Sequence, residues 1–576
     1  MRQLLLGNEA VARGAWEAGV RVASAYPGTP STEITETIAR FADVYAEWAP
    51  NEKVALEVGV GASLGGARSL VCMKHVGLNV AADPLFTAAY CGVNGGLVIV
   101  VADDPGMNSS QNEQDSRFYA RFSLVPMLEP ADSDECLRFT KLAFELSERY
   151  DAPVLLRLTT RVAHSRSLAE TGERQAVEVK PYRKEPAKYV MMPAYARARH
   201  VVVEERMARL RAELDALGLD AVEKHGSRLG IVAAGVVSQY VREALPNADL
   251  FQVGMVNPLP LDALRRFAAE HDELVVVEEL EPFLEDALKA AGIACHGKGL
   301  FGSRGELSAP IVAAKLGGEA AQGTAPMADL PVRPPVLCPG CPHRGTFHVF
   351  QKLKLTVMGD IGCYTLASSP PLEAMDACLC MGASIGMAHG MEKARGPQDK
   401  LVAVLGDSTF LHSGMTGLLN AVYNNSHTTT VILDNSTTGM TGHQDNPATG
   451  RTLQGVDAAA VDLEGLCRSL GVRDVRVIDP FDLKAAEAGM KEALAFDGPS
   501  VVIFRRPCAL LPVVPKQPPH QVDPAVCRRC KACLKIGCPA IELVEGAVRI
   551  NATLCVGCGL CAKVCPFGAI GKEAAQ

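Results

Sequence analysis

The chain has 576 residues, of which 48% are hydrophobic and 21% are charged, and its formal net charge is −8. This composition excludes an intrinsically disordered protein, and a chain of this length should divide into roughly three to five domains. The modest negative charge, with no basic stripe, predicts that no nucleic acid is bound. We find no apolar run of about 18 residues and no signal peptide, so we expect a cytoplasmic protein without a membrane span.

The pattern of apolar residues over 1–185 predicts a first domain of alternating helices and strands. A helical pattern covers residues 8–19, and a short strand is expected at 22–25. The continuous apolar run at 97–102 is typical of a parallel strand that is buried on both faces. The Pro-, Lys- and Tyr-rich residues 180–195 then predict a connection.

A second α/β domain is expected at residues 200–320. Its strands are predicted at 229–233, 248–253 and 273–278. The Gly-, Ala- and Pro-rich stretch 317–335 predicts the linker that follows.

A third α/β domain is expected at residues 335–512, with apolar strands at 401–405, 430–433 and 500–504. A Pro-rich hinge separates it from a cysteine-rich domain at 520–576. The predicted architecture is therefore three doubly wound α/β domains followed by a small metal-cluster domain.

Eight of the 19 cysteines fall within the last 50 residues. They form two Cys-x-x-Cys-x-x-Cys runs, each followed by a fourth cysteine and a proline, which is the pattern of bacterial two-cluster ferredoxins. The alternative is a pair of zinc sites, but the triplets and the prolines favour 4Fe–4S clusters. We expect a hairpin at 541–550, turning near Gly546, between the runs. The predicted ligands are Cys527, Cys530, Cys533 and Cys565 for one cluster, and Cys538, Cys555, Cys558 and Cys561 for the other.

Two segments of the third domain predict a Mg²⁺ and diphosphate site. Gly406, Asp407 and Ser408 follow one apolar strand, and Asn435 and Thr437 follow the next. Mg²⁺ prefers oxygen ligands, and open α/β sheets bind ligands at the carboxyl ends of their strands. Gly-Asp alone is common in turns, but the two-part pattern resembles the signature of thiamine diphosphate enzymes. This resemblance implies cofactor binding by all five residues, with Mg²⁺ held by Asp407, Asn435 and the carbonyl of Thr437.

The same resemblance implies two functional residues in the first domain. Glu57 resembles the glutamate that stands beside the aminopyrimidine ring of thiamine, and among Val, Leu and Gly it should be desolvated, which favours a proton-donating carboxyl. The alternative is an exposed residue on a helix face. Thr29, within Tyr26-Pro-Gly-Thr-Pro30, is similar to the threonine that points toward the 2-oxoacid in pyruvate:ferredoxin oxidoreductases. An ordinary turn is its alternative.

Four further cysteines resemble a third set of cluster ligands. The segment Cys338-Pro-Gly-Cys341-Pro-His343-Arg344 is similar to the opening of the thiamine-binding part of 2-oxoacid oxidoreductases. Cys363 and Cys508 occupy the places of the third and fourth ligands in that family. The resemblance implies a proximal 4Fe–4S cluster on Cys338, Cys341, Cys363 and Cys508. The competing interpretation is a structural zinc on Cys338, Cys341 and His343.

These motifs identify the chain as a member of the thiamine diphosphate-dependent 2-oxoacid:ferredoxin oxidoreductases. Segments 74–84, 406–414 and 338–344 resemble the large, alpha subunit of the indolepyruvate branch. The resemblance implies a thiamine pyrimidine-binding, a transketolase C-terminal-like and a thiamine diphosphate-binding domain, in that order. It also implies oxidative decarboxylation of aryl pyruvates, such as indolepyruvate, with coenzyme A to aryl-acetyl-CoA, CO₂ and reduced ferredoxin.

The implied cofactors are thiamine diphosphate, Mg²⁺ and three 4Fe–4S clusters. The implied partners are a small second (beta) subunit, because a domain of the pyruvate enzymes is absent here, and ferredoxin, in a heterotetramer with two copies of this chain. Alternatives are another 2-oxoacid (branched-chain or phenylpyruvate), a non-oxidative thiamine-dependent decarboxylase, or an electron-transfer subunit with a degenerate thiamine site. The cluster cysteines disfavour the decarboxylase, and intact Glu57, Asp407 and Asn435 disfavour the degenerate subunit.

Overall fold

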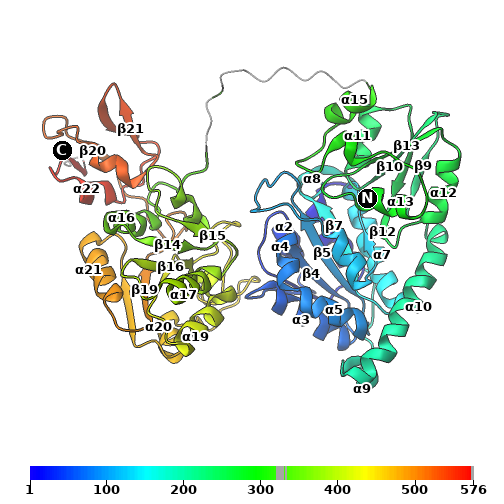
Figure 1. Ribbon diagram of the computed structural model, residues 1–576, viewed down its shortest axis with the longest axis horizontal. Helices are drawn as coiled ribbons and strands as arrows, with labels where there is room; N and C mark the ends of the chain where they lie inside the picture. Colours follow the sequence, from blue (N-terminus) through cyan, green and yellow to red (C-terminus); the bar gives the residue numbers. More distant parts are fainter. Residues whose placement is uncertain (319–329, 331–333, 573–576) are drawn as a thin grey trace. The chain divides into compact units, whose positions relative to one another are not determined.

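The computed structural model describes residues 1–318, 330 and 334–572, and it comprises two compact units (Figure 1). Unit 1 is Met1–Pro326 and unit 2 is Met327–Gln576. Both have α/β folds built on parallel sheets. In the described ranges, no helix is both long and apolar enough to cross a membrane.

The larger sheet of unit 1 has seven strands in the order β12-β6-β7-β5-β4-β2-β3. Neighbouring strands are parallel, except that β12 is antiparallel to β6. Every residue of the three central strands is buried, as expected of their continuous apolar sequences. The strands are β2 (Val22–Ala25), β3 (Tyr45–Trp48), β4 (Ser69–Lys74), β5 (Leu97–Asp103), β6 (Met127–Leu128), β7 (Val154–Thr159) and β12 (Met255–Asn257).

The helices of this part of unit 1 connect successive strands. The pair α1 and α7 pack closely, because Gly14 lets the two backbones approach: a Cβ there would lie 2.6 Å from the carbonyl oxygen of Leu137. An antiparallel pair of strands distant in sequence, β1 (Arg2–Leu6) and β8 (Arg166–Glu170), forms a separate two-stranded sheet. The helices are α1 (Gly7–Glu17), α2 (Thr32–Ile38), α3 (Glu52–Leu64), α4 (His75–Val80), α5 (Ala82–Cys91), α6 (Arg117–Ser123), α7 (Ser133–Tyr150) and α8 (Thr160–His164).

The smaller sheet of unit 1 has four strands in the order β13-β10-β11-β9. Its apolar side chains share one continuous core with those of the seven-stranded sheet, and β12 extends that sheet from the second half of the unit. The strands are β9 (Ala221–Glu223), β10 (Leu229–Ala234), β11 (Asp249–Val253) and β13 (Glu273–Val277). The helices are α11 (Val237–Ala244), α12 (Leu261–Ala269), α13 (Phe283–Ala290), α14 (Lys298–Phe301) and α15 (Ala309–Leu316).

The stretch expected to be a simple connection contains helical structure. The short helix α9 (Pro186–Tyr189) is followed by α10 (Pro193–Leu217), a helix that crosses the expected domain boundary at residue 200. The helix α10 was missed because its sequence is strongly charged and shows almost no apolar stripe. Two buried or half-buried arginines, Arg199 and Arg206, fix it to the carbonyl oxygens of Tyr90 and Ala89 in α5.

The sheet of unit 2 has six parallel strands in the order β15-β14-β16-β17-β19-β18. Alternate strand residues enter two separate cores, one on each face, as the two-residue period of a strand requires. The strands are β14 (Thr356–Gly359), β15 (Ala377–Cys378), β16 (Leu401–Gly406), β17 (Thr429–Asp434), β18 (Asp474–Ile478) and β19 (Ser500–Arg505). The helices are α16 (His343–Leu353), α17 (Ala383–Arg395), α18 (Asp407–Thr409), α19 (Met415–Tyr423), α20 (Leu463–Ser469) and α21 (Leu483–Leu494), with short turns η1 (Cys363–Ser368) and η2 (Phe410–Gly414).

The C-terminal part of unit 2 consists of two small antiparallel pairs and two short helices. The predicted hairpin at 541–550 is confirmed, and its turn uses Glu545 and Gly546, both at positive φ. The predicted linker at 317–335 lies almost entirely outside the described residues. The elements are β20 (His520–Val522), β21 (Ile541–Val544), β22 (Ala547–Ile550), β23 (Ile570–Lys572), η3 (Ala532–Ile536) and α22 (Leu560–Val564).

Candidate functional site

Three oxygen atoms meet at the carboxyl ends of β16 and β17. Asp407 begins α18 directly after β16, and Asn435 follows β17. The side-chain oxygen of Asn435 lies 3.0 Å from Asp407 Oδ1 and 3.1 Å from the carbonyl oxygen of Thr437. Asp407 is 1% exposed, and its burial, together with the nearby Asp434 carboxylate, raises its pKa to about 7.

These separations fit an octahedral metal site. Oxygen ligands about 2.0–2.1 Å from Mg²⁺ stand about 3 Å from their neighbours in the octahedron. Three acceptors at this spacing repel one another unless a cation lies among them, or unless the Asn435 amide turns over and donates to the other two. The donor set of Asp407, Asn435 and Thr437 therefore suits Mg²⁺.

The other two predicted cofactor residues lie at the same edge of the sheet. Gly406 packs against Tyr364, where a Cβ would lie 3.0 Å from a ring carbon. The Ser408 hydroxyl accepts a hydrogen bond from Thr438 Oγ1 at 3.0 Å, and its backbone N–H donates to Asp407 Oδ1 at 2.8 Å. The structure thus brings all five predicted residues together.

The four cysteines of the predicted proximal cluster also form one group. Cys338 and Cys341 precede α16, Cys363 begins η1, and Cys508 follows β19. Burial raises the pKa of Cys341 to about 12, and the thiols of Cys363 and Cys338 add to the shift. Burial likewise raises the pKa of Cys363 to about 11, with Cys508 and Cys338 contributing. Each thiol therefore lies within electrostatic range of others in the set.

This cysteine group is joined directly to the oxygen site. The backbone N–H of Cys508 donates to the carbonyl oxygen of Asn435 at 2.9 Å. A Cβ on Gly439 would lie 3.5 Å from both Cys363 Sγ and the Asn435 side chain. The loop after β17 thus lies against two of the four cysteines and provides two of the three candidate metal ligands, Asn435 and Thr437.

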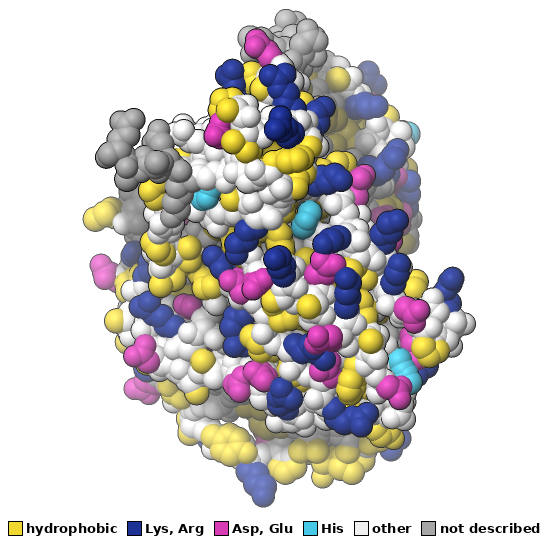
Figure 2. All heavy atoms as spheres, turned by 90° about the vertical axis from the view of Figure 1, so that its left-hand side faces the viewer, with side chains coloured by type: hydrophobic (Ala, Val, Ile, Leu, Met, Phe, Trp, Pro, Cys, Tyr) yellow, Lys and Arg dark blue, Asp and Glu magenta, His cyan; other side chains and the backbone are white. Residues whose placement is uncertain are grey.

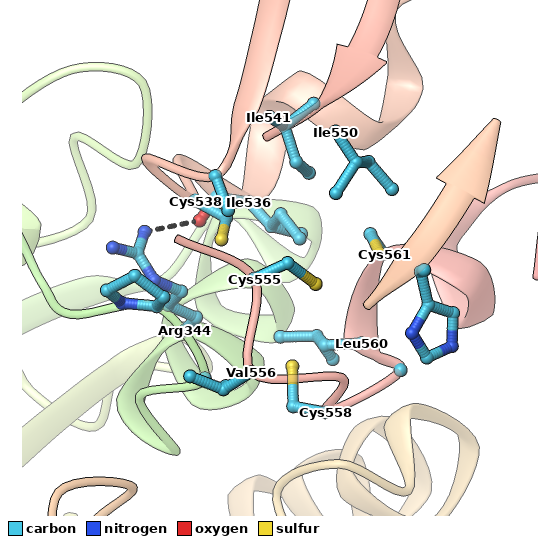
Figure 3. A pocket seen from close by; sticks show the side chains of 15 residues that line it. Arg344, Ile536, Cys538, Ile541, Ile550, Cys555, Val556, Cys558, Leu560 and Cys561 are labelled. Carbon is cyan, nitrogen blue, oxygen red and sulfur yellow. Dashed lines mark hydrogen bonds between the residues drawn. The ribbon is translucent and has the colours of Figure 1, made fainter. Parts of the chain in front are cut away.

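The eight C-terminal cysteines surround two separate cavities. In the first, four sulfur atoms lie among Ile536, Ile541, Ile550 and Leu560 (Figure 3). The second cavity is lined by the other four cysteines and by apolar side chains, including Val548 and Ile570. The quartets are Cys538, Cys555, Cys558 and Cys561 in the first cavity, and Cys527, Cys530, Cys533 and Cys565 in the second. In each quartet, the three closely spaced cysteines of one run lie with the fourth cysteine of the other run, which is the grouping that the sequence predicted.

The zinc alternative concerned Cys338, Cys341 and His343. Burial lowers the pKa of His343 to about 4, so its ring is neutral, and the ring packs edge-on against Tyr364 with centroids 5.9 Å apart. In the part of the chain that the structure describes, no three His, Cys, Asp or Glu side chains converge closely enough to hold a single metal ion.

In unit 1, Thr29 lies in the loop after β2, close to the end of β4. The Ser109 hydroxyl donates to the carbonyl oxygen of Thr29 at 3.4 Å, and the Lys74 ammonium donates to the carbonyl oxygen of Ser109 at 2.7 Å. Burial lowers the pKa of Lys74 to about 8, although the Asp104 carboxylate opposes the shift. No individual role for Lys74 is predicted from the sequence, because a single lysine at the end of a strand carries no signal until the neighbouring loops are known.

The surroundings expected for Glu57 are not found in unit 1. Its side chain is 46% exposed and forms an ion pair with Lys53 on the outer side of α3. Glu52, the first residue of α3, is instead 5% exposed, and its carboxylate packs against Gly77 in α4. Five residues correspond to about 140° around a helix and about 7.5 Å along it, so Glu57 points away from the core and lies further from the carboxyl edge of the sheet.

Charged side chains of both signs are interspersed on the face drawn in Figure 2. Lys and Arg side chains alternate there with Asp and Glu, and hydrophobic side chains lie between them. Neither sign of charge dominates this face.

Three families match parts of the sequence. Residues 13–225 match "Pyruvate flavodoxin/ferredoxin oxidoreductase, thiamine diP-bdg", and residues 360–504 match "Thiamine pyrophosphate enzyme, C-terminal TPP binding domain". Residues 548–571 match "4Fe-4S binding domain". The fold and these matches define a thiamine diphosphate-dependent 2-oxoacid:ferredoxin oxidoreductase with an iron–sulfur domain.

Similar proteins span the whole chain. Indolepyruvate oxidoreductase subunit IorA of Archaeoglobus fulgidus is 40% identical over 605 residues, covering 98% of this chain and 97% of the relative. The subunit of the same name from Pyrococcus horikoshii is 41% identical over 627 residues, covering 99% and 96%. The 2-oxoglutarate synthase subunit KorA of Methanothermobacter thermautotrophicus is 32% identical over 173 residues, 28% of this chain and 45% of that protein. The chain belongs to the family of indolepyruvate oxidoreductase IorA subunits.

Proposed function

We propose that this chain is the thiamine-binding catalytic subunit of an indolepyruvate:ferredoxin oxidoreductase. The oxygen triad at Asp407 carries the proposal, because the same loop contacts a group of four cysteines. A 2-oxoacid anion and coenzyme A would give an acyl-CoA, CO₂, one proton and two electrons. Electrons released beside a metal–diphosphate site can then pass directly to a cluster.

Thiamine diphosphate would bind through Mg²⁺ at Asp407, Asn435 and Thr437, with Gly406 and Ser408 close to the diphosphate. When bound, the cofactor supplies the carbanion chemistry that decarboxylation of a 2-oxoacid needs. The protein residues hold the metal, position the diphosphate and keep the strand ends rigid. Burial of Asp407 and its contact with Ser408 support this role.

We propose that Glu52 rather than Glu57 is the carboxylate that exchanges a proton with the aminopyrimidine ring. Glu52 is buried at the start of α3, and helices of a doubly wound sheet begin at the edge where ligands bind. Glu57, by contrast, is about half exposed and forms an ion pair with Lys53. Glu57 remains the candidate from the sequence, and variants of the two residues separate the possibilities.

The 2-oxoacid is proposed to lie near Thr29 and Lys74. Thr29 follows β2 and Lys74 ends β4, both at the carboxyl edge of the seven-stranded sheet, and Ser109 contacts both residues. The ammonium of Lys74 would neutralise the substrate carboxylate, and the Thr29 hydroxyl would donate to an oxygen of the substrate.

We propose that electrons pass from the proximal group to the Cys538 quartet and then to the Cys527 quartet. A Cβ on Gly340, between Cys338 and Cys341, would lie 3.6 Å from the Cβ of Cys558 and 2.5 Å from Val556. The loop of the proximal group therefore packs directly on the first cavity (Figure 3). The second cavity shares no lining residue with that loop.

The assembly we propose pairs this chain with a small second subunit and with ferredoxin, in a heterotetramer that contains two copies. The names of the two IorA relatives support a partner subunit, since each is called a subunit of an oxidoreductase. We also propose that the chain comprises four domains, at residues 1–185, 200–320, 335–512 and 520–576.

The proposal is tested with the purified complex of this chain and its second subunit. Indolepyruvate and coenzyme A together should reduce ferredoxin or a viologen, and omission of either should stop the reduction. Phenylpyruvate, branched-chain 2-oxoacids and 2-oxoglutarate define the substrate class. CO₂ release without any reduction of the acceptor would instead identify a non-oxidative decarboxylase.

A further inference from the structure

A buried guanidinium lies between two of the candidate cluster sites. Arg344 stands on α16, three residues after Cys341, and it is 2% exposed. Its Nε donates to the carbonyl oxygen of Cys338 at 3.1 Å. Its Nη1 donates to the carbonyl oxygen of Ile536 at 2.9 Å (Figure 3). Its Nη2 donates to the carbonyl oxygen of Leu337. One side chain thus joins the cysteine loop before α16 to the end of η3.

Arg344 has no carboxylate partner among the residues that the structure describes, and all three of its acceptors are neutral carbonyls. A buried charge without a counter-charge is costly, so a negative group is expected nearby. Arg344 lines the first cavity together with Cys538 and Cys558, and its guanidinium also contacts the loop of Cys338. Cysteines of both candidate sites therefore lie close to this side chain.

The backbone on the far side is shaped for this contact. Gly537, directly after Ile536, has a φ of 66°, which favours glycine. A Cβ at this position would lie 3.2 Å from Arg344 Nη1 and 3.0 Å from a ring carbon of Pro371. A larger residue would therefore push the guanidinium away from the carbonyl oxygen of Ile536.

We propose that Arg344 is the shared counter-ion of the proximal cluster and the Cys538-quartet cluster, and that its charge raises the reduction potentials of both. The inference rests on the proposed function, because it requires clusters in both sites. A thiolate-bound cluster is anionic and gains one more negative charge on reduction, so a buried cation beside it stabilises the reduced form. Arg344 acts through its charge on the two neighbouring electron carriers.

The test is a redox titration of the intact complex, monitored by electron paramagnetic resonance, in parent, Arg344→Gln and Arg344→Lys proteins. In Arg344→Gln, two of the three cluster potentials should fall, each by at least a tenfold change in the reduction equilibrium, which is about 59 mV for one electron. The third potential, that of the Cys527 quartet, should not move. Arg344→Lys keeps the charge, so its potentials should stay close to those of the parent.

Arg476→Gln is the matched control, because it removes one positive charge from an ion-paired arginine on β18 and should leave all three potentials unchanged. Unchanged potentials in a fully iron-loaded Arg344→Gln protein, or equal shifts in the Gln and Lys variants, would overturn the proposal. Loss of iron from both variants would also overturn it, by showing a purely structural role. If only Arg344→Gln loses iron and Arg344→Lys keeps reduction potentials like those of the parent, the result supports the proposed role of the positive charge. A parent protein without three clusters would refute the proposed function instead.

Discussion

At the scale of single residues, the proposed chemistry uses side chains at the carboxyl ends of parallel strands. Asp407 and Asn435 follow strands in unit 2, whereas in unit 1 Thr29 follows β2 and Lys74 is the last residue of β4. The position of each is set by the buried strand that it ends or follows. This is why single substitutions should separate metal binding, proton transfer and substrate binding.

Replacing Asp407 by Ala should abolish activity, because it removes one of three oxygen ligands from the proposed Mg²⁺ site. Mg²⁺ and thiamine diphosphate should both be lost on gel filtration of the variant, while iron is retained. Metal analysis and cofactor extraction measure this outcome. Stoichiometric thiamine diphosphate in the purified variant would show that the metal site lies elsewhere.

Glu52→Gln and Glu57→Gln should differ strongly. If Glu52 exchanges the proton, its amide variant should keep the cofactor and lose about 10²–10⁴-fold in kcat, which is typical of a general acid–base group. Glu57→Gln should stay within about threefold of the parent, because that side chain is exposed and paired with Lys53. The reverse pattern would restore the assignment made from the sequence.

The pH dependence of kcat/KM should show a basic limb set by Lys74. The pKa of Lys74 is about 8, so the ammonium is present below this pH and is lost as the pH rises through it. Because a substrate carboxylate binds the charged form, kcat/KM should fall above about pH 8. Lys74→Arg keeps the charge and should move the limb upward. A profile that is flat to pH 9.5 in the parent would exclude Lys74 from substrate binding.

At the scale of elements, most strands follow from the sequence. The predicted strands at 22–25 and 401–405 differ from β2 and β16 by at most one residue, because continuous apolar runs between turns allow few alternatives. The cysteine quartets were also predictable, since their spacing alone encodes the crossed ligand pattern. The helix α10 was not, because it is fixed by buried arginines rather than by an apolar stripe.

The orientation of Glu57 was missed for a related reason. The sequence shows which residues a helix contains, whereas the buried side depends on the neighbouring elements. In α3, contacts with α4 and α5 bury Glu52 and leave Glu57 outside. Lys74 contacts the distant Ser109, and Arg344 contacts the distant Ile536 as well as its own loop, so no local pattern could reveal either set of surroundings.

A buried arginine and two carboxylates connect the two sheets of unit 1, and loss of the arginine should strongly reduce the free energy of unfolding. Arg117 on α6 pairs with Asp115 at 2.6 Å and with Glu278, after β13, at 2.7 Å, and all three side chains are at most 3% exposed. Arg117→Ala leaves two buried carboxylates without their cation, which typically costs about 3–5 kcal/mol. Backbone amide hydrogens of α6 and β13 should therefore exchange faster in Arg117→Ala than in the parent protein.

The control for this prediction is Arg265→Ala, which breaks an exposed pair with Asp262 and should cost less than about 1 kcal/mol. Equal protection of α6 and β13 in the parent and Arg117→Ala proteins would mean that apolar packing alone holds the two sheets together.

At the scale of the whole molecule, the chain combines thiamine-binding α/β folds with an iron–sulfur domain. In unit 2, the candidate diphosphate site, the proximal cysteines and the first C-terminal cavity are linked by direct contacts. This continuity distinguishes an enzyme that passes on single electrons from a thiamine decarboxylase.

The most direct test is the metal and cofactor content of the purified complex, measured by mass spectrometry and cofactor extraction. We expect about twelve iron atoms per chain, four for each of three clusters, together with one thiamine diphosphate and one Mg²⁺. Cys508→Ser should reduce the iron by about four atoms and leave the C-terminal clusters intact. About eight iron atoms in the parent, with zinc bound at Cys338 and Cys341, would contradict the proximal cluster and the electron route that begins there.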